Sequence, residues 1–381
     1  MDNVLFRNLE EKSIMKVLIS ANVLFTIANF RKDFIKFLKD QNLDVVCIAS
    51  EDSLSSNGKK VLDELDVKFI NIEVSRKGLN PIEDLKYLYN LYKIYKSQKA
   101  DYVFHFTIKP NIYGTIAAKL AGIKSINTIN GLGSAIIGGG VLAKVLKLLY
   151  KFALSFSTKV FFQNEDDKSF FINEFLVNKE KVSIVPGSGV DTAFFNNYEA
   201  KTEKLTFLLV ARLLKDKGIY EYVQAVRALK EKYSEVEFLL AGPYDDGNPS
   251  AIQPDEVKAW EESNTIQYIG KTNNIKEFLS KTDVVVLPSY REGLSRFLIE
   301  SASASKPIVT TNVAGCKDVV DEASNGFLCE VKDSISLCEA MEKMILLKKE
   351  ELLKMGEASK KIAQQKFDKD IVNKIYFKEI V

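Results

Sequence analysis

Two hydrophobic patterns alternate along the chain. Short apolar runs are typical of strands buried on both faces of a parallel sheet, and stretches with apolar residues every three or four positions are typical of amphipathic helices. In the first half, this pattern predicts strands at 17–20, 45–50, 68–72, 101–106, 125–129, 159–163 and 182–185. It predicts helices at 30–40, 59–65, 81–99, 112–121 and 142–156.

The second half follows the same scheme. Strands are predicted at 206–210, 236–241, 266–269, 284–287 and 308–311. Helices are predicted at 219–233, 251–262, 275–280, 294–305, 334–347, 350–367 and 371–381. Strands that alternate with helices favour parallel sheets covered on both faces, so we expect an α/β fold.

The chain is long enough for two domains. Its 381 residues are 46% apolar and 27% charged, as in ordinary globular proteins. A polar stretch at about 191–204 has no buried-strand run and is the expected linker. We therefore expect an N-terminal domain at 1–192 and a C-terminal domain at 203–365. The last helix, within 366–381, could pack back on the first domain.

The two halves resemble each other in sequence. Residues 101–112 align without a gap with residues 283–294. Further along, five identities fall in step: Lys124, Ile126, Thr128, Asn130 and Gly133 match Lys306, Ile308, Thr310, Asn312 and Gly315. Some of this identity is what any strand–helix–strand unit needs. The repeat predicts two Rossmann-like domains facing each other across a cleft.

The richest chemistry lies within 283–315. Pro288 ends a buried strand, and Glu292 and Gly293 are expected to open the next helix. This segment should lie at the carboxyl end of the strand, where open parallel sheets bind ligands. Glu292 and Glu300 are eight residues apart and would share a face if both were helical. Unpaired amides at the helix start could hold a phosphate, so the segment suits a sugar nucleotide. The alternative is two surface glutamates.

These residues carry a resemblance to a known family. The two glutamates are preceded by Leu287-Pro288-Ser289 and followed by Lys306-Pro307 and Gly315, and Ala211-Arg212-Leu213 and Lys215-Asp216-Lys217-Gly218 stand upstream. The pattern resembles the retaining family-4 glycosyltransferases, which have the two-domain GT-B fold. It departs from the family at Ala211, where glycine is usual.

The resemblance implies roles for the charged residues. Glu292 would reach the donor sugar and Glu300 the nucleotide ribose, while Arg212 and Lys217 would hold the donor diphosphate. It implies front-face transfer with retained anomeric configuration, no enzyme nucleophile, and a leaving phosphate that takes the acceptor's proton.

The remaining donor contacts are expected from backbone. Amides near Gly293 and Leu294 would bind the diphosphate, and backbone near Gly270 and Lys271 would meet the nucleotide base.

The acceptor is expected on the N-terminal side of the cleft. Candidate residues follow two predicted strands: Lys109, Asn111, Asn130, Gly131 and Gly133. Lys109 could pair an acceptor phosphate, or be a solvated loop lysine. His105 lies within a strand pattern, where a satisfied buried histidine is a better interpretation than a catalytic base.

Three segments resemble one subgroup of this family in particular. Residues 107–111, 130–133 and 188–191 are similar to bacterial transferases that extend undecaprenyl-diphosphate-linked glycans, such as α-1,3-N-acetylgalactosaminyltransferases. This implies a hexosyltransferase that moves an N-acetylhexosamine or hexose from a UDP-sugar to a lipid-diphosphate-linked glycan in surface polysaccharide or protein glycan synthesis.

Residues 138–156 are the candidate membrane contact. Lys144, Lys147 and Lys151 recur at helical spacing among apolar residues, as in helices that lie on anionic membranes. The alternative is a helix packed on the sheet with a lysine edge. No uncharged apolar run is long enough to span a bilayer. We expect a cytoplasmic protein on the inner face of the cell membrane.

Composition argues against several classes of protein. The formal charge of +2 does not indicate a nucleic-acid binder. Four scattered cysteines favour reduced thiols, and a single histidine leaves no room for histidine-rich metal sites. We expect no cofactor and no metal, because Arg212, Lys217 and helix amides can neutralise the diphosphate. Residues 1–14 lack the apolar core of a signal peptide, and we expect either that they are an extension or that Met15 is the true start.

Two other functions remain open from the residues alone. A non-hydrolysing sugar-nucleotide epimerase would keep the fold, and a non-catalytic lobe could bind a partner transferase. The presence of Glu292, Glu300, Arg212 and Lys217 together argues against both.

Overall fold

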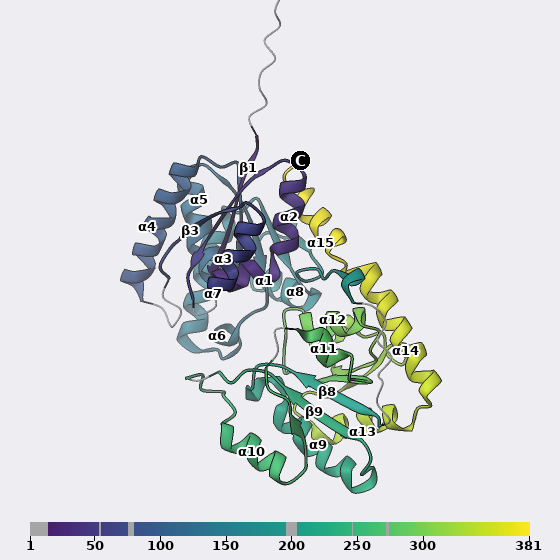
Figure 1. The fold of residues 1–381 in the computed structure, drawn as a ribbon. Coiled ribbons are helices and arrows are strands. Elements are labelled where there is room, and N and C mark those ends of the chain that lie inside the picture. The colour runs from purple at the N-terminus through teal and green to yellow at the C-terminus, as the bar shows by residue number, and fades with distance from the viewer. Residues whose placement is uncertain (1–13, 53–54, 75–79, 196–203, 246, 272–273) are drawn as a thin grey trace, which may run out of the picture. The chain divides into compact units, whose positions relative to one another are not determined.

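The structure, a computed structural model, describes residues 14–52, 55–74, 80–195, 204–245, 247–271 and 274–381. The expected N-terminal extension and most of the expected linker lie outside these residues. The chain divides into two compact units (Figure 1). The first unit comprises residues 1–128, 149–160 and 380, and the second comprises residues 129–148, 161–379 and 381. The domain ranges expected from the sequence stay predictions.

A seven-stranded sheet is built from the first half of the chain, in the order β3-β2-β1-β4-β5-β6-β7. Its strands are β1 Lys16–Val23, β2 Asp44–Ser50, β3 Lys68–Asn71, β4 Tyr102–Phe106, β5 Lys124–Ile129, β6 Lys159–Phe162 and β7 Val182–Ile184. The helices are α1 Leu24–Phe30, α2 Lys32–Asp40, α3 Ser55–Glu64, α4 Pro81–Gln98, η1 Pro110–Gly114, α5 Thr115–Ala121, α6 Ser134–Ile137, α7 Gly140–Ser155, α8 Glu165–Asn173, η2 Lys179–Lys181 and η3 Thr192–Phe194.

A six-stranded sheet follows, in the order β10-β9-β8-β11-β12-β13. Its strands are β8 Thr206–Val210, β9 Glu237–Ala241, β10 Gln267–Tyr268, β11 Val284–Leu287, β12 Ile308–Thr311 and β13 Gly326–Cys329. The helices are η4 Lys215–Lys217, α9 Ile219–Lys232, α10 Pro254–Glu262, α11 Ile275–Leu279, α12 Arg296–Ser303, η5 Lys317–Val319, α13 Ser334–Leu346, α14 Lys349–Ile362, η6 Ala363–Phe367 and α15 Lys369–Phe377.

The sequence repeat corresponds to a repeated structural unit. β4 pairs with β5 in parallel, and β11 pairs with β12 in parallel, each across one helical connection. The predicted pattern of buried parallel strands is confirmed, because all four residues of β11 and of β12 are buried. Each strand therefore ends at the same edge of its sheet as its neighbour, and the loops at that edge can share a ligand.

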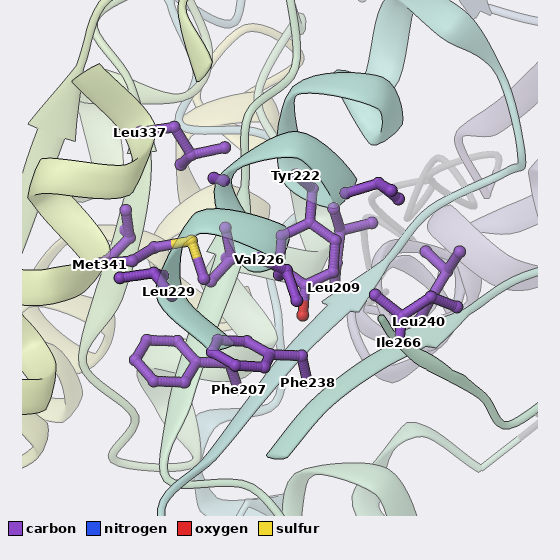
Figure 2. Packing of buried hydrophobic residues seen from close by; sticks show 14 of the residues in the cluster. Phe207, Leu209, Tyr222, Val226, Leu229, Phe238, Leu240, Ile266, Leu337 and Met341 are labelled. Atoms are coloured by element: carbon purple, nitrogen blue, oxygen red, sulfur yellow. The ribbon is translucent and has the colours of Figure 1, made fainter. Parts of the chain in front are cut away.

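The core of the second unit lies on both faces of the six-stranded sheet. On one face, Phe207 and Phe238 stack with ring centroids 5.4 Å apart, and α9 covers them with Tyr222, Val226 and Leu229 (Figure 2). The other face is covered by α11, α12 and η6, through Leu279, Leu298 and Phe367 among others. A sheet buried on both faces fixes the strand ends from which the functional loops leave.

Two differences from the predictions affect the loop after β11 and its surroundings. Helix α12 begins at Arg296 and not at residue 294, because the Ser295 side chain caps it by accepting from the amide of Leu298 at 3.4 Å. Glu292 therefore lies in the preceding loop. The pattern also missed α8, whose first turn is polar and acidic at Glu165, Asp166 and Asp167.

Candidate active site

The loop at 288–295 leaves the carboxyl end of β11 and is held by backbone hydrogen bonds at two points. The Glu292 amide donates to Ala314 O at 3.0 Å, and the Ser295 amide donates to Gly315 O at 2.9 Å. Between these points, the amides of Gly293 and Leu294 donate to no acceptor within the described residues. Two successive free amides in a fixed loop are donors of the kind that can bind an anion.

Glu292 and Lys217 are brought together at this loop. Their carboxylate Oε1 and ammonium Nζ are 2.6 Å apart, and Ser289 Oγ donates to the same Oε1 at 2.9 Å. The Glu292 Oε2 atom has no partner among the described residues. Gly218 allows this approach, because a Cβ there would lie 2.1 Å from Pro288 O. The site thus places a cation beside the free amides and leaves one carboxylate oxygen available.

Arg212 lies at the neighbouring strand end, after β8. Its Nη1 atom is 2.8 Å from Asp245 Oδ2, in an exposed ion pair. An exposed pair of this kind contributes roughly 1 kcal/mol or less, so a phosphate could displace the carboxylate. Arg212 therefore pairs with Asp245, and Lys217 pairs with Glu292, although both basic residues follow the same strand, β8.

The expected base-binding segment lies at the same edge. Gly270 O accepts from the Gly242 amide at 2.9 Å, and the Ala211 amide donates to Ala241 O at 3.1 Å. The ends of β8, β9 and β10 are therefore linked side by side, with Lys271 exposed immediately after Gly270. Backbone therefore lies at this edge, and the Tyr268 hydroxyl also reaches it, donating to Gly242 O at 2.7 Å.

Glu300 lies on α12, one helix turn from Arg296. The Arg296 Nε atom donates to Glu300 Oε1 at 2.7 Å, and Oε2 has no partner among the described residues. Burial raises the pKa of the Glu300 carboxyl, and the charge and hydrogen bond of Arg296 oppose that rise. Because Glu292 is in the loop, the two glutamates do not share a helical face, and this part of the sequence interpretation was wrong.

Two of the expected acceptor-side residues, Asn130 and Gly131, lie against the same loop. A Cβ on Gly293 would lie 2.0 Å from Asn130 O, and a Cβ on Gly131 would lie 3.4 Å from Gly293. Gly133, further along, accepts from the Ile136 amide at the start of α6 at 3.2 Å. Only a glycine at 293 allows the two backbones to come this close.

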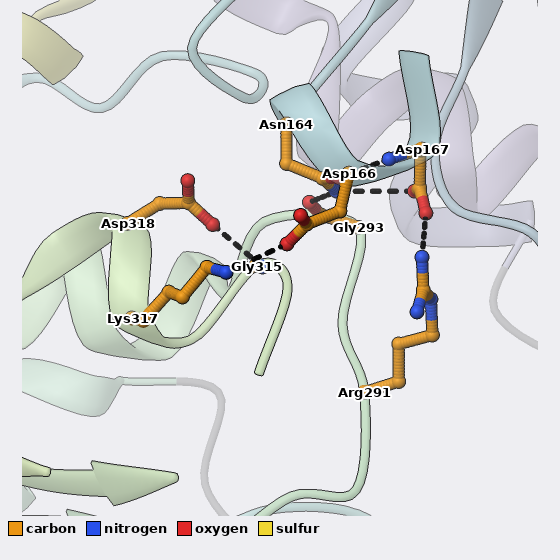
Figure 3. Close-up of polar contacts among 8 residues, drawn as sticks. All are labelled: Asn164, Asp166, Asp167, Arg291, Gly293, Gly315, Lys317 and Asp318. Carbon is orange, nitrogen blue, oxygen red and sulfur yellow. Dashed lines mark hydrogen bonds and ion pairs between the residues drawn. The ribbon is translucent and has the colours of Figure 1, made fainter. Parts of the chain in front are cut away.

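The first turn of α8 contributes contacts that the sequence pattern did not indicate (Figure 3). Asn164 Nδ2 donates to Gly293 O at 2.6 Å, and buried Asp167 pairs with Arg291. Asp166 lies 2.9 Å from Lys317 in a more exposed ion pair. The motif Asn164-x-x-Asp167 is a recognisable helix cap and could have indicated the helix, but not the partners 124 residues away.

The other two acceptor-side candidates belong to the first unit and are buried. Lys109 Nζ is 2.6 Å from Asp84 Oδ1, and Tyr113 donates to Asp84 Oδ2 at 2.9 Å. Asn111 donates to Thr128 O at 2.8 Å, and its Oδ1 atom is buried without a partner within the described residues. Lys109 is thus not a solvated loop lysine, and its charge is already neutralised by a carboxylate.

The single histidine is a buried core residue, as expected. His105 Nε2 lies 2.9 Å from the Tyr95 hydroxyl, and Nδ1 lies 3.4 Å from Thr115 Oγ1. Burial lowers the pKa of His105 to about 3, and a hydrogen bond with Asn127 opposes the shift. The ring is therefore neutral at physiological pH and packs within the fold.

The described ranges contain neither a cluster of metal-ligating side chains nor a membrane-spanning helix. No group of three or more His, Cys, Asp or Glu side chains is arranged there to hold a metal ion. None of the helices built from those ranges has both the length and the apolar character to cross a bilayer. The expectation that the reaction uses no metal stays a prediction.

The fold of two parallel sheets has counterparts among known proteins. Solved structures share the fold. A glycosyltransferase from Rickettsia africae superposes with a TM-score of 0.77 at 18% identity, over 96% of this chain and 97% of the other. An Anabaena protein in complex with UDP and glucose gives 0.76 at 16% identity, over 96% and 99%.

Sequence comparisons agree along nearly the whole chain. The family described as "Glycosyl transferases group 1" matches residues 190–362, and "Glycosyl transferase 4-like" matches residues 16–164. A Campylobacter jejuni N,N'-diacetylbacillosaminyl-diphospho-undecaprenol alpha-1,3-N-acetylgalactosaminyltransferase is 31% identical over 93% of this chain and 95% of its own. An Escherichia coli UDP-Gal:alpha-D-GlcNAc-diphosphoundecaprenol alpha-1,3-galactosyltransferase is 27% identical over 80% and 81%.

The chain therefore belongs to the group 1 glycosyltransferases, with the GT-B fold. The predicted fold class and the predicted enzyme class, a hexosyltransferase, are both confirmed.

Because His105 is buried as a neutral ring, we expect the free energy of unfolding to depend on pH. The folded state keeps the ring neutral, whereas the unfolded chain takes up a proton below the ordinary pKa of 6.5. The stabilisation is thus fully present above pH 6.5 and is lost as the pH falls towards 3. Between pH 7.5 and 5, the free energy of unfolding should fall by about 2 kcal/mol from this group.

Urea unfolding of the wild type and of His105→Gln over this pH range measures the difference. Carboxylates titrate alike in both proteins, so the wild type should lose more stability than the variant. The C2 proton of the only histidine should also show no titration between pH 7.5 and 5 by NMR. Equal pH slopes, or a ring that titrates near 6.5, would contradict the account.

Proposed function

We propose that this protein is a retaining glycosyltransferase that moves an N-acetylhexosamine or hexose from a UDP-sugar to a polyprenyl-diphosphate-linked glycan. The pathway would be synthesis of bacterial surface polysaccharide or a protein glycan. The observation that carries the proposal is the likeness, over 93% of the chain, to a transferase named for a diphospho-undecaprenol acceptor. The UDP complex of a protein with the same fold supports the donor class.

The donor diphosphate is the ligand that the loop suits best. The free amides of Gly293 and Leu294 would donate to its oxygens, and Lys217 and Arg212 would supply positive charge. The available Oε2 atoms of Glu292 and Glu300 would accept from a sugar hydroxyl and from the ribose, respectively. The nucleotide base would contact backbone near Gly270 and Lys271.

Transfer would proceed on one face of the sugar. The acceptor hydroxyl attacks the anomeric carbon as the bond from that carbon to the diphosphate oxygen breaks. The departing oxygen takes the acceptor's proton, so no enzyme base is needed. The fixed amides and Lys217 stabilise the negative charge that grows on the diphosphate, which is the largest effect that such a site offers.

The acceptor would approach the donor beside Gly293. Asn130 and Gly131 already lie against that residue, with Gly133 following in the same segment. Lys109 and Asn111 would act by shaping the turn after β4, because Lys109 is neutralised by Asp84 and does not offer a free charge.

The membrane-facing surface would be α7. Its buried residues include Ala143 and Leu146, yet a second apolar stripe is exposed, with Leu148 at 67% and Phe152 at 55%. The exposed lysines at 144 and 151 have no ion-pair partner in the described part of the chain, whereas Lys147 pairs with Glu174 at 3.1 Å. An exposed apolar stripe with unpaired lysines suits the inner, anionic leaflet where a lipid-linked acceptor lies.

No specific observation favours either of the two other functions, the sugar-nucleotide epimerase or the non-catalytic lobe that binds a partner transferase. The relatives from Campylobacter jejuni and Escherichia coli are both named transferases.

Nucleotide binding tests the donor half of the proposal. UDP at 100 times its dissociation constant should add about 2.7 kcal/mol to the stability of the folded protein, measured as a rise in melting temperature. Glu300→Ala should lose most of this stabilisation, because the ribose contact is removed. Glu231→Ala, an exposed glutamate on the helix α9, is the matched control and should respond as the wild type does. No response of the wild type to UDP would contradict the proposal.

Vesicle binding tests the membrane surface. The wild type should co-sediment with vesicles of phosphatidylcholine and phosphatidylglycerol. Burying one Leu or Phe contributes about 1.5–3 kcal/mol. Leu148→Glu combined with Phe152→Glu should therefore weaken binding at least tenfold. Ile335→Glu combined with Leu346→Glu makes the same chemical change at exposed positions of α13 and should leave binding unchanged. Equal binding by both double variants would rule out α7 as the contact.

A further inference from the structure

One peptide unit of the loop at 288–295 is held by a residue outside that loop. The carbonyl of Gly293 and the amide of Leu294 belong to the same peptide bond, and the described chain contains no cis peptide. In a planar trans peptide, the C=O and N–H bonds point in opposite directions. A group that fixes the Gly293 carbonyl therefore also fixes the direction of the free Leu294 amide.

Asn164 is that group. Its Nδ2 atom donates to Gly293 O at 2.6 Å (Figure 3). Its own orientation is set by Asp167, because Asn164 Oδ1 accepts from the Asp167 amide at 2.7 Å and Nδ2 also donates to Asp167 Oδ2 at 3.0 Å. A side-chain amide with all these bonds in place has one orientation.

Asp167 anchors the arrangement. Its side chain is fully buried and pairs with Arg291, the residue before Glu292. Arg291 and Gly293 flank Glu292, so both contacts from α8 converge on the residues next to the proposed sugar contact. A buried carboxylate of this kind is costly unless paired, which fixes the loop against the helix.

We propose that Asn164, oriented by Asp167, is a positioning residue for transfer: it aims the Leu294 amide at the donor diphosphate. This inference rests on the proposed function. It predicts that loss of the Asn164 donor lowers kcat, because an amide aimed at growing charge acts mainly in the transition state. Binding of UDP itself should change little, since Glu300 and Lys217 remain.

Asn164→Asp is the sharpest variant. The new carboxylate can accept from the Asp167 amide and cap α8, but it cannot donate to Gly293 O, and it also faces the Asp167 carboxylate that Asn164 Nδ2 contacts at 3.0 Å. Asn164→Ser is the second variant, because serine also caps helices and is too short to cap and reach Gly293 together. Asp166→Asn is the matched control, since it changes the same helix turn at a side chain that pairs with Lys317 and makes no contact with Gly293.

The assay measures UDP release from UDP-hexoses and UDP-N-acetylhexosamines with a membrane lipid extract, together with the UDP dissociation constant and the melting temperature. Asn164→Asp and Asn164→Ser should each lower kcat about 10- to 100-fold. Their UDP affinity should stay within about threefold of wild type. The control should keep kcat within about twofold.

Several outcomes would overturn the inference while the proposed function stands. These are unchanged kcat in both cap-retaining variants, an equal loss in Asp166→Asn, or a loss that only follows a fall in the folded fraction. A wild type that releases no UDP with any of these donors, or does not bind UDP, would instead overturn the proposed function and this inference with it.

Discussion

The fixed backbone of the loop after β11 is the constraint on which the site depends. The hydrogen bonds from Glu292 to Ala314 and from Ser295 to Gly315 hold the loop at both ends and leave the two amides between them free. Donors that are fixed before the ligand arrives need no reorganisation when charge develops. The six-stranded sheet supplies the rigid support, because its strands are buried on both faces and pack to fixed positions.

Charge around this loop is arranged in pairs of unequal burial. Lys217 and Glu292 share one partly buried contact, Arg212 and Asp245 share an exposed one, and Asp167 is fully buried against Arg291. Exposed pairs exchange partners at little cost, whereas breaking a buried pair leaves an uncompensated charge. This difference in burial suits a site in which the exposed Arg212 exchanges Asp245 for the ligand, while the buried pair of Asp167 and Arg291 keeps the loop in place.

Much of this could be predicted from sequence because it depends on local pattern. The strands β11 and β12 are uninterrupted apolar runs, and Lys217, Glu292 and Glu300 follow a spacing shared with a known family. The predicted start of α12 was wrong by two residues. The helix begins where the Ser295 side chain caps it, and the apolar pattern does not show that position. The pairs Asp167–Arg291 and Asp84–Lys109 join residues far apart in sequence, and periodicity carries no information about such contacts.

The stereochemistry of the product tests the central claim most directly. The protein would be incubated with UDP-sugars of α configuration and a polyprenyl-diphosphate-linked glycan, and the new linkage read from the coupling of its anomeric proton by NMR. A loop that holds the diphosphate while the acceptor enters on the same face predicts an α linkage. A β linkage would show attack from the opposite face, and would contradict the mechanism assigned to this site.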